Sequence, residues 1–366
     1  MNNNKKTIVV GLMGFFIGAA VLYGLIKLFP AVFLKETTML KKDVTIVDNG
    51  IAESVEKVYD SVVVVSTYKN KTKIASGTGF VFKKDGKVAY ILTNNHVIEK
   101  GDDIKVTFTN EKEENVEVVG SDKFADIAVL SIDSSKIITV ASIGTNDKTK
   151  VGDTVFAVGA PLDNAYSWTV TRGILSGKNR LVEVSTESNR STDWVMSVMQ
   201  TDAAINSGNS GGPLSNANGE VIGITSLKLV SSGVEGMGFA IPIETAIDYA
   251  NKIIKGEDIV QPYIGVSMIN VADAYYKREY FNYLSSLNLT TGVFVVDVEK
   301  DGDADKGGIK ADDVIIAVDD TNINSLAYFR YKLYSHKKGD KVKIKVNRNG
   351  DIKDLTITIN HEKSVK

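Results

Sequence analysis

A glycine-rich stretch around one serine is the part of this sequence best suited to covalent chemistry. Residues 208–212 read Gly-Asn-Ser-Gly-Gly, which places Ser210 between glycines on both sides. Glycine lets the backbone turn tightly and direct amide groups toward an oxygen that develops negative charge. A single stretch of this kind often forms only a turn, so Ser210 is a candidate nucleophile that needs a base elsewhere in the chain.

The candidate base and its partner precede the serine. His96 ends an apolar run, and it is the only histidine among residues 1–335. Asp126 opens another apolar run, where a buried carboxylate would be costly unless a group such as an imidazole N–H compensated it. The order His, Asp, Ser is that of the chymotrypsin-type triad. We expect Ser210 to be the nucleophile, His96 the general base, and Asp126 the group that fixes the imidazole tautomer.

Composition excludes several other kinds of chemistry. The 366 residues carry 43 Lys and Arg against 45 Asp and Glu, a formal net charge of −2. This balance gives no field that would attract nucleic acid, so no nucleic-acid partner is expected. The chain contains no cysteine and three histidines, which excludes disulfides, thiolate nucleophiles and Cys-ligated metals. We expect neither a metal nor a cofactor.

One acidic segment superficially resembles a calcium loop. Asp301, Asp303 and Asp305 alternate as in such a loop, but Lys306 stands where Gly is required and Asp312 where Glu is expected. The sequence therefore predicts a solvated turn followed by the beginning of a helix.

The N-terminus carries a candidate membrane span. After Lys5 and Lys6, residues 7–26 are uncharged, which is long enough at about 1.5 Å per residue to cross a bilayer core of about 30 Å. A cleaved signal peptide is the alternative, suggested by small residues at 18–20, but residues 21–26 stay apolar beyond them. We expect an uncleaved single-pass anchor, with the N-terminus cytoplasmic and the catalytic part extracytoplasmic.

The elements that must position the candidate triad are mainly β-strands. Short β-branched runs separated by Gly, Asn, Asp and Lys clusters predict an all-β barrel or sandwich over residues 62–243, closed by a helix at 243–255. A smaller unit follows, with five predicted strands and two helices near 304–307 and 325–334. The tyrosines at 275, 276, 280 and 283 predict a helix packed against that unit.

Five sequence blocks together resemble the HtrA (high-temperature-requirement) serine proteases. They are Ser-Gly-Thr-Gly-Phe-Val at 76–81, Thr-Asn-Asn-His-Val at 93–97, Asp-Ile-Ala-Val-Leu at 126–130, Gly-Asn-Ser-Gly-Gly-Pro-Leu at 208–214 and Gly-Phe-Ala-Ile-Pro at 238–242. The unit after them resembles the PDZ domain of that family. The resemblance implies a mainly β chain: a chymotrypsin-like double β-barrel protease domain, then a PDZ domain, with an N-terminal transmembrane helix.

The resemblance also implies domain boundaries. We expect a cytoplasmic stub and anchor at 1–29, a stalk at 30–50, a trypsin-like protease domain at 51–257 and a PDZ domain at 258–361.

Further site residues follow from the same resemblance. Amides of Gly208 and Ser210, with the Asn209 peptide between them, would form the oxyanion hole. Substrate would meet Ala204 and Ile205 near the floor of the primary pocket, where no carboxylate stands to pair with Lys or Arg. The segment 222–227 resembles the strand on which substrate lies, and its candidate residues are Thr225, Ser226 and Leu227. We expect cleavage after small aliphatic residues.

The predicted partners are proteins and peptides. Tyr263, Ile264, Gly265 and Val266 match the carboxylate-binding loop of the family's PDZ domain, so peptides with a free C-terminus are expected there. The resemblance implies a homotrimer whose cleavage of misfolded or regulatory proteins is gated by such peptides. Two alternatives remain: a protease-inactive chaperone, and a scaffold or sensor whose PDZ domain does the work.

Overall fold

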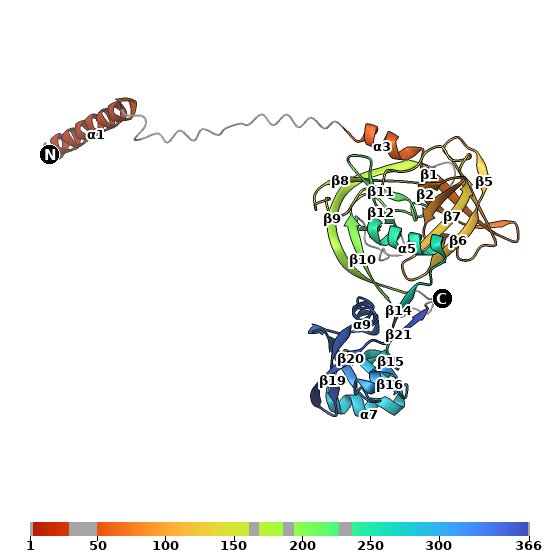
Figure 1. Cartoon of the computed structure of the whole chain (residues 1–366). Helices are drawn as coiled ribbons and strands as arrows, with labels where there is room; N and C mark the ends of the chain where they lie inside the picture. The colour runs from red at the N-terminus through yellow and green to blue at the C-terminus, as the bar shows by residue number, and fades with distance from the viewer. Residues whose placement is uncertain (1–2, 29–49, 161–167, 186–193, 227–235, 365–366) are drawn as a thin grey trace. The chain divides into compact units, whose positions relative to one another are not determined.

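The computed structural model describes residues 3–28, 50–160, 168–185, 194–226 and 236–364, and Figure 1 draws the others as a grey trace. The chain divides into two compact units, residues 1–49 and residues 50–366. The predicted stalk, apart from Gly50, lies outside the described residues. The predicted boundary at 257/258 falls inside the second unit and stays a prediction.

In the first unit, the described residues form the helix α1 (Asn3–Leu28), which includes the predicted span. Its segment Val9–Leu28 has a mean hydropathy of 2.3 and is long and apolar enough to cross a membrane. A signal sequence would meet the same criteria. The helix therefore agrees with an N-terminal membrane segment without distinguishing an anchor from a signal.

The first sheet of the second unit has seven antiparallel strands in the order β5-β4-β1-β2-β3-β7-β6. Its strands are β1 (Val62–Lys69), β2 (Thr72–Asp85), β3 (Val88–Thr93), β4 (Asp103–Thr107), β5 (Glu113–Asn115), β6 (Glu117–Asp122) and β7 (Ile127–Asp133). The two outermost strands, β5 and β6, are separated in the chain by Val116 alone. Because Val116 alone links the two edge strands, these edges must lie close together, and the sheet therefore curls toward a barrel. No pairing between β5 and β6 closes it in the described strand order.

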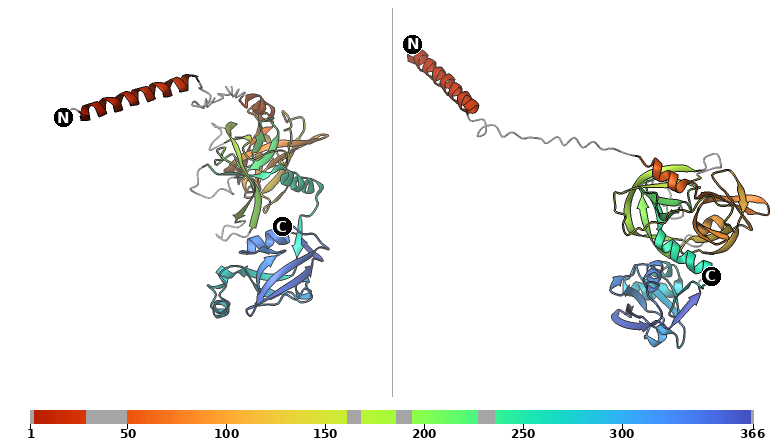
Figure 2. Two further views of the ribbon diagram at one scale, coloured as in Figure 1. Left: turned by 90° about the vertical axis from the view of Figure 1, so that its left-hand side faces the viewer. Right: turned by 45° about the horizontal axis from the view of Figure 1, so that its top comes forward.

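The next six strands form a closed barrel in the order β10-β13-β12-β11-β8-β9. They are β8 (Thr154–Gly159), β9 (Thr169–Val184), β10 (Trp194–Thr201), β11 (Pro213–Asn216), β12 (Val221–Thr225) and β13 (Gly238–Pro242). Figures 1 and 2 show the two sets of strands as neighbours. The predicted double-barrel architecture is therefore present.

Short helices link and cover the two sets of strands. They are α3 (Ala52–Tyr59), α4 (Asn95–Ile98) and α5 (Ile243–Lys255). The α5 helix contacts β6 and β7 as well as β12 and β13. One hydrophobic core accordingly contains residues from both sides, among them Phe80, Ile127, Phe156, Ile224 and Ala246. This shared core holds the His and Asp side of the molecule against the Ser side.

A separate sheet with its own core follows α5. Its strands β15 (Val266–Asn270), β16 (Val293–Val298), β17 (Val314–Val318), β19 (Lys341–Arg348) and β20 (Asp351–Thr358) pair in that order, and β18 (Thr321–Asn322) pairs with β17. Strands β14 (Val260–Tyr263) and β21 (His361–Ser364) form a two-stranded sheet. The helices are α6 (Val271–Ala274), α7 (Arg278–Leu287), α8 (Asp303–Lys306) and α9 (Leu326–Leu333).

The tyrosine-rich segment packs mainly as its spacing indicates. Tyr275, Tyr280 and Tyr283 lie against a small core that includes Phe294, and the Tyr280 and Phe294 ring centroids are 4.8 Å apart. Tyr276 is instead 92% exposed, because it lies in the turn between α6 and α7.

Candidate active site

The three candidate catalytic residues lie at the ends of strands from both barrels. His96 is in α4, directly after β3; Asp126 is in the turn between β6 and β7; and Ser210 is in the turn between β10 and β11. Gly211 packs directly against Thr93 and the Asn94 backbone, because a Cβ built on it would lie 2.4 Å from Thr93 Oγ1 and 3.0 Å from Asn94 N. The serine turn thus lies against the segment that leads into His96.

His96 and Asp126 form a close pair. The Nδ1 atom of His96 lies 2.9 Å and 2.8 Å from the two carboxylate oxygens of Asp126. The backbone N–H of His96 also donates to Asp126 Oδ1 at 3.0 Å. Asp126 is 1% exposed, whereas the His96 side chain is 24% exposed. The arrangement fixes the ring with Nδ1 on the carboxylate and leaves Nε2 for other partners.

Two residues complete the surroundings of Asp126, in contacts that the sequence did not predict; one of them, Ser226, was expected to bind substrate instead. The buried Ser226 hydroxyl donates to Asp126 Oδ2 at 3.0 Å, and Asn94 Nδ2 donates to the Asp126 carbonyl at 2.8 Å. Asp126 itself adopts a left-handed backbone with φ 55°. These hydrogen bonds hold a strained turn and a buried charge that would otherwise be costly.

The turn that carries Asp126 is stabilised from its other end by Asp122. The Asp122 carboxylate accepts hydrogen bonds from the backbone N–H groups of Phe124 at 2.9 Å and Ala125 at 2.6 Å. Burial raises the pKa of the Asp122 carboxyl, and these two amides act in the opposite direction. The turn is therefore held by carboxylates at both ends.

The serine turn is fixed by Thr78 on β2. The Thr78 N–H donates to the Ser210 carbonyl at 2.8 Å, and its hydroxyl donates to the Gly208 carbonyl at 2.6 Å. A Cβ on Gly77 would lie 2.7 Å from a Val97 methyl, and Gly211 adopts φ 85°. These glycines are required because β2 and α4 approach the turn closely. Thr78 was not singled out from the sequence, although its block at 76–81 is one of the five that resemble the HtrA proteases.

The predicted oxyanion residues lie in this buried turn. Asn209 N–H donates to Asn206 O at 3.0 Å, so its amide already has a partner. The Thr225 hydroxyl donates to the carbonyls of Asn209 at 2.6 Å and Gly212 at 3.1 Å. The turn is therefore rigidly held around Gly208 and Ser210, whose amides remain the predicted donors.

The predicted substrate-binding residues have different surroundings. Ala204 is exposed, and its carbonyl accepts from the Thr171 hydroxyl at 3.0 Å. Ile205 is 8% exposed and packs into the core of the second barrel. The side chains of Thr225 and Ser226 are buried and hydrogen-bonded within the site. Their backbone N–H groups also donate within the protein, to the carbonyls of Gly212 and Phe239. Leu227 lies outside the described residues.

The predicted carboxylate-binding residues lie at one end of a groove. Tyr263, Ile264, Gly265 and Val266 line a cavity of about 340 Å³ between β15 and α9. The β15 strand is at the edge of its sheet, since it pairs with β16 alone in the described strand order. The described part of the chain therefore offers an open strand edge beside an apolar cavity.

A second histidine–aspartate pair lies near that loop, and it corrects the prediction of a solvated turn. Asp303 does begin a helix, as expected, but it is 2% exposed. It accepts hydrogen bonds from the backbone N–H of Asn360 at 2.7 Å and of His361 at 3.1 Å, and His361 Nδ1 lies 3.0 Å away. Burial alone would raise the Asp303 pKa, but the donors on Asn360 and His361 outweigh it and lower that pKa.

The described residues contain no group of three or more His, Asp or Glu side chains placed to hold a metal ion.

Two family models match the chain at these two parts. A trypsin-like peptidase domain matches residues 77–224, which include His96, Asp126 and Ser210, and a PDZ domain matches residues 262–359.

Relatives and solved structures extend these matches. The Serine protease Do-like HtrB of Bacillus subtilis (strain 168) is 39% identical over 328 residues, covering 85% of this chain and 71% of that protein. The Serine protease Do-like HtrA of Lactococcus lactis subsp. lactis (strain IL1403) is 34% identical, covering 83% and 81%. A structure of the HtrA-type protease AlgW with a decapeptide has a TM-score of 0.63 at 28% identity, covering 87% of this chain and all of that one. The family indicated by the sequence blocks is confirmed: this chain belongs to the HtrA serine proteases, with a trypsin-like peptidase domain followed by a PDZ domain.

Proposed function

We propose that this chain is a membrane-anchored serine endopeptidase that cleaves misfolded or regulatory proteins outside the cytoplasm. The observation that carries the proposal is the buried Asp126 carboxylate, which holds His96 beside the rigid turn of Ser210. Membership of a serine protease family supports the same reaction.

The first half of the reaction forms an acyl-enzyme. Ser210 Oγ attacks the scissile carbonyl carbon while His96 Nε2 takes the hydroxyl proton. Asp126 stabilises the resulting imidazolium, because its carboxylate already accepts from Nδ1–H. The carbonyl oxygen becomes an oxyanion, to which the amides of Gly208 and Ser210 donate. Collapse of this intermediate expels the amine, which takes the proton from His96.

The second half hydrolyses the acyl-enzyme. His96 Nε2 takes a proton from water, and the resulting hydroxide attacks the ester carbonyl. The same two amides stabilise the second oxyanion. Its collapse breaks the bond between the carbonyl carbon and Ser210 Oγ and releases the acid product, while His96 returns the proton to Oγ. The hydrogen bonds from Thr78 keep the turn in one geometry through both halves, which is the preorganisation that such catalysis needs.

Replacement of Ser210 by alanine tests the nucleophile. Cleavage of unfolded casein by the Ser210→Ala protein should fall by about 10⁵-fold or more, and labelling by a fluorophosphonate probe should disappear. Ser207→Ala is the matched control, because this exposed serine lies three residues earlier in the same turn. Cleavage retained by Ser210→Ala would remove the assignment. A folded wild-type chain that neither cleaves casein nor reacts with the probe would support a chaperone or scaffold instead.

We further propose that cleavage occurs after small aliphatic residues such as Val, Ala, Ile or Thr. No carboxylate stands at Ala204 or Ile205 to pair with a cationic side chain, and burying an unpaired cation costs several kcal/mol. Mass-spectrometric mapping of casein fragments checks this preference. Predominant cleavage after Lys, Arg or aromatic residues would show that the pocket is assigned wrongly.

We also propose that peptides with a free C-terminus bind along β15 and regulate cleavage. The support is the open edge of β15 beside the loop of Tyr263 to Val266, which suits addition of a peptide strand. Titration of cleavage with a peptide and with its C-terminally amidated form checks this. Activation by the free acid alone is expected, whereas equal effects of the two forms would contradict carboxylate recognition.

Membrane attachment and assembly belong to the same proposal. The support for an anchor is the apolar segment Val9–Leu28 preceded by Lys5 and Lys6. Protease added to intact cells or spheroplasts should digest the barrels and leave the N-terminal stub protected, and a mature protein beginning near residue 21 would contradict the anchor.

Family membership supports a homotrimer, which light scattering of the detergent-solubilised chain would measure.

A further inference from the structure

The Thr78 hydroxyl on β2 makes two hydrogen bonds that can run in one direction only. The Ala160 N–H donates to Thr78 Oγ1 at 3.1 Å, and the same oxygen lies 2.6 Å from the Gly208 carbonyl. Because a carbonyl only accepts, the hydroxyl must donate to Gly208. The Thr78 side chain is completely buried. It therefore joins the end of β8 to the turn of Ser210.

This hydroxyl fixes one peptide plane of the serine turn. The plane between Gly208 and Asn209 is held at its carbonyl by Thr78 and at its N–H by the Asn206 carbonyl, at 2.6 Å and 3.0 Å. Gly208 adopts φ 103°, in a region that glycine enters at little steric cost. The direction of the Gly208 N–H therefore depends on the held plane that follows it.

The other proposed oxyanion donor is held from a different side. The Ser210 N–H belongs to the peptide plane of the Asn209 carbonyl, which accepts from the Thr225 hydroxyl at 2.6 Å and the Gly212 N–H at 2.9 Å. Thr225 belongs to the closed barrel, whereas Thr78 belongs to the seven-stranded sheet. The two amides thus depend on two threonines, one from each set of strands.

The end of β8 also supports the turn by direct contact. A Cβ built on Gly159 would lie 2.4 Å from Asn209 Oδ1 and 2.9 Å from Asn209 Cα. Because one of these atoms is backbone, a side chain at residue 159 would displace the turn. Gly159 therefore lets β8 pack against Asn209, directly beside the Ala160 N–H that donates to Thr78.

We propose that Thr78 is a positioning residue for the oxyanion: its hydroxyl, supported by the end of β8, directs the Gly208 N–H toward the carbonyl oxygen as that oxygen gains charge. This inference rests on the proposed endopeptidase mechanism. The oxygen needs both amides most when the bond to Ser210 Oγ is forming. The Thr78 hydroxyl should therefore affect turnover much more than substrate affinity.

Two substitutions at residue 78 test the hydroxyl. Thr78→Val keeps the shape of the side chain and removes the oxygen, whereas Thr78→Ser keeps the oxygen. The substrate is an internally quenched peptide that spans a mapped casein cleavage site. For Thr78→Val, kcat should fall about 10- to 100-fold and KM should stay within about threefold, because the amide remains and only its direction relaxes. Thr78→Ser should keep kcat within about threefold of wild type.

A boronic acid analogue of the same peptide measures the oxyanion site itself. A bond forms between boron and Ser210 Oγ, the hydroxyl proton passes to His96, and a boronate oxygen takes the place of the oxyanion. For Thr78→Val, the inhibition constant should rise by the same factor as kcat/KM falls. The shape of the pH profile of kcat/KM should not change, because the substitution leaves the His96–Asp126 pair in place.

Thr201→Val is the matched control for loss of a buried hydroxyl. Thr201 on β10 is completely buried, accepts from the Ala203 N–H at 3.0 Å and donates to the Ile174 carbonyl at 2.8 Å. Its kcat should stay within about threefold of wild type, while urea unfolding shows a loss of stability similar to that of Thr78→Val. Equal falls in kcat for the two variants would overturn the inference.

Gly159→Ala tests the support from β8 without changing Thr78. The added methyl must displace Asn209, so kcat should fall with little change in KM. Gly144→Ala is the control, because a Cβ there would lie 2.9 Å from Glu220 Cβ, in a crowded place outside the turn. An unchanged kcat in Gly159→Ala would contradict the support from β8.

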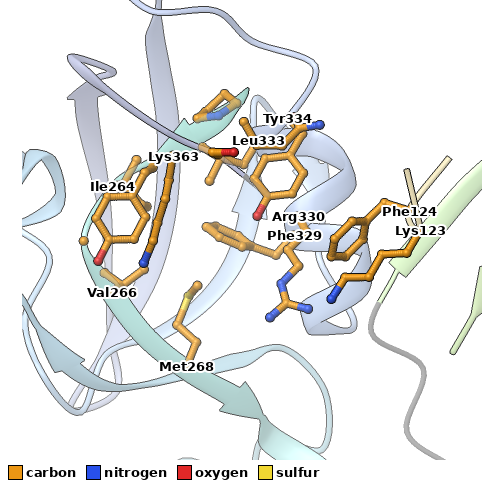
Figure 3. A pocket seen from close by; sticks show the side chains of 15 residues that line it. Lys123, Phe124, Ile264, Val266, Met268, Phe329, Arg330, Leu333, Tyr334 and Lys363 are labelled. Carbon is orange, nitrogen blue, oxygen red and sulfur yellow. The ribbon is translucent and has the colours of Figure 1, made fainter. Parts of the chain in front are cut away.

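Binding at the peptide groove should not change. Figure 3 shows this groove, and neither Thr78 nor Gly208 is among the described residues that line it. Thr78→Val should therefore bind a fluorescent peptide with a free C-terminus as tightly as the wild-type chain does. Weaker binding would show that the substitution acts beyond the serine turn and would overturn the inference.

The outcomes separate this inference from the function beneath it. If the wild-type chain does not cleave the quenched peptide, or if Ser210→Ala does, the proposed endopeptidase is wrong. If the wild-type chain cleaves through Ser210 and Thr78→Val retains its kcat, the proposed function stands and the positioning role is overturned. A Thr78→Ser chain as slow as Thr78→Val would also overturn it, because the hydroxyl would then not be the group that matters.

Discussion

Each histidine of the chain lies beside an aspartate, and two of the three pairs, His96–Asp126 and His361–Asp303, have nearly the same local chemistry. In each pair a buried carboxylate accepts the backbone N–H of the histidine and lies within 3.0 Å of its Nδ1 atom. In each pair a third group also donates, from Ser226 to Asp126 and from Asn360 to Asp303. Contact between an imidazole and a buried carboxylate is therefore not by itself a sign of catalysis.

What differs is the backbone around each carboxylate and what lies beyond each ring. Asp126 is in a left-handed turn, and its histidine lies beside the glycine-rich turn of Ser210. Asp303 is the first residue of α8, and its histidine is on β21 with its side chain 58% exposed. The first pair lies beside the turn of the proposed nucleophile, whereas the second joins β21 to the beginning of α8.

Replacing the histidine of each pair with alanine should give the largest difference between the two pairs. His96→Ala removes the proposed general base, so the rate of casein cleavage should fall by about 10³-fold or more. His361→Ala removes one partly exposed hydrogen bond, so cleavage should persist while the free energy of unfolding falls by about 1 kcal/mol or less. Cleavage assays and urea unfolding of both variants measure the contrast. Equal loss of activity in the two would break the distinction between the pairs.

Asparagine at each aspartate sharpens the comparison. Asp126→Asn should lower turnover by about 10³- to 10⁴-fold while the chain stays folded, because the amide favours the wrong imidazole tautomer. Asp303→Asn should leave turnover within about twofold and lower stability by about 1 to 3 kcal/mol, as hydrogen bonds to a buried charge are weakened. Steady-state kinetics and thermal unfolding distinguish these results. A large fall in turnover for Asp303→Asn would assign the second pair a part in catalysis.

The smallest expected effect is the pH dependence of the stability that Asp303, in the second pair, contributes to the fold. The folded-state pKa of Asp303 is held below its ordinary value, so its contribution to stability is present above about pH 4 and is lost as pH falls through the folded-state pKa. The difference in unfolding free energy between wild type and Asp303→Asn should therefore shrink between pH 7 and pH 3. Asp122, whose pKa is raised, is present in both proteins, so its contribution cancels in this difference of unfolding free energies. A difference that stays constant over this range would contradict the proposed hydrogen-bonding of the carboxylate.

The sequence predicted local features better than contacts between distant residues. The β-branched runs and the closing helix at residues 243–255 correspond to observed elements, because their patterns are set by neighbours in the chain. The long strand β9 and its partner β10 were not predicted, since β9 carries Arg, Lys, Asn and Glu at positions that do not form an apolar run. The proximity of His96 to Asp126 was expected from the cost of burying an unpaired carboxylate.

The missed features depend on contacts across the fold. Ser226 is 100 residues from Asp126, and nothing in its neighbours shows that its hydroxyl turns toward that carboxylate. Asp303 looked solvated because its immediate neighbours are charged, yet its donors come from residues 360 and 361. Thr78 appeared as one residue of a strand, although it fixes the serine turn. The catalytic roles themselves stay predictions until the variants are measured.

The pairing of β14 with β21 also constrains how the chain reaches its folded state during synthesis. Tyr263 pairs with His361, so this contact closes a loop of about 100 residues, whose entropy must be lost before the pair forms. Lys363 and Ser364 line the peptide groove, and the groove wall is therefore incomplete on a nascent chain until β21 has been translated. The two barrels, which precede β14, can fold before that moment. Synthesis from the N-terminus thus delays completion of the groove until after the peptidase part has been made.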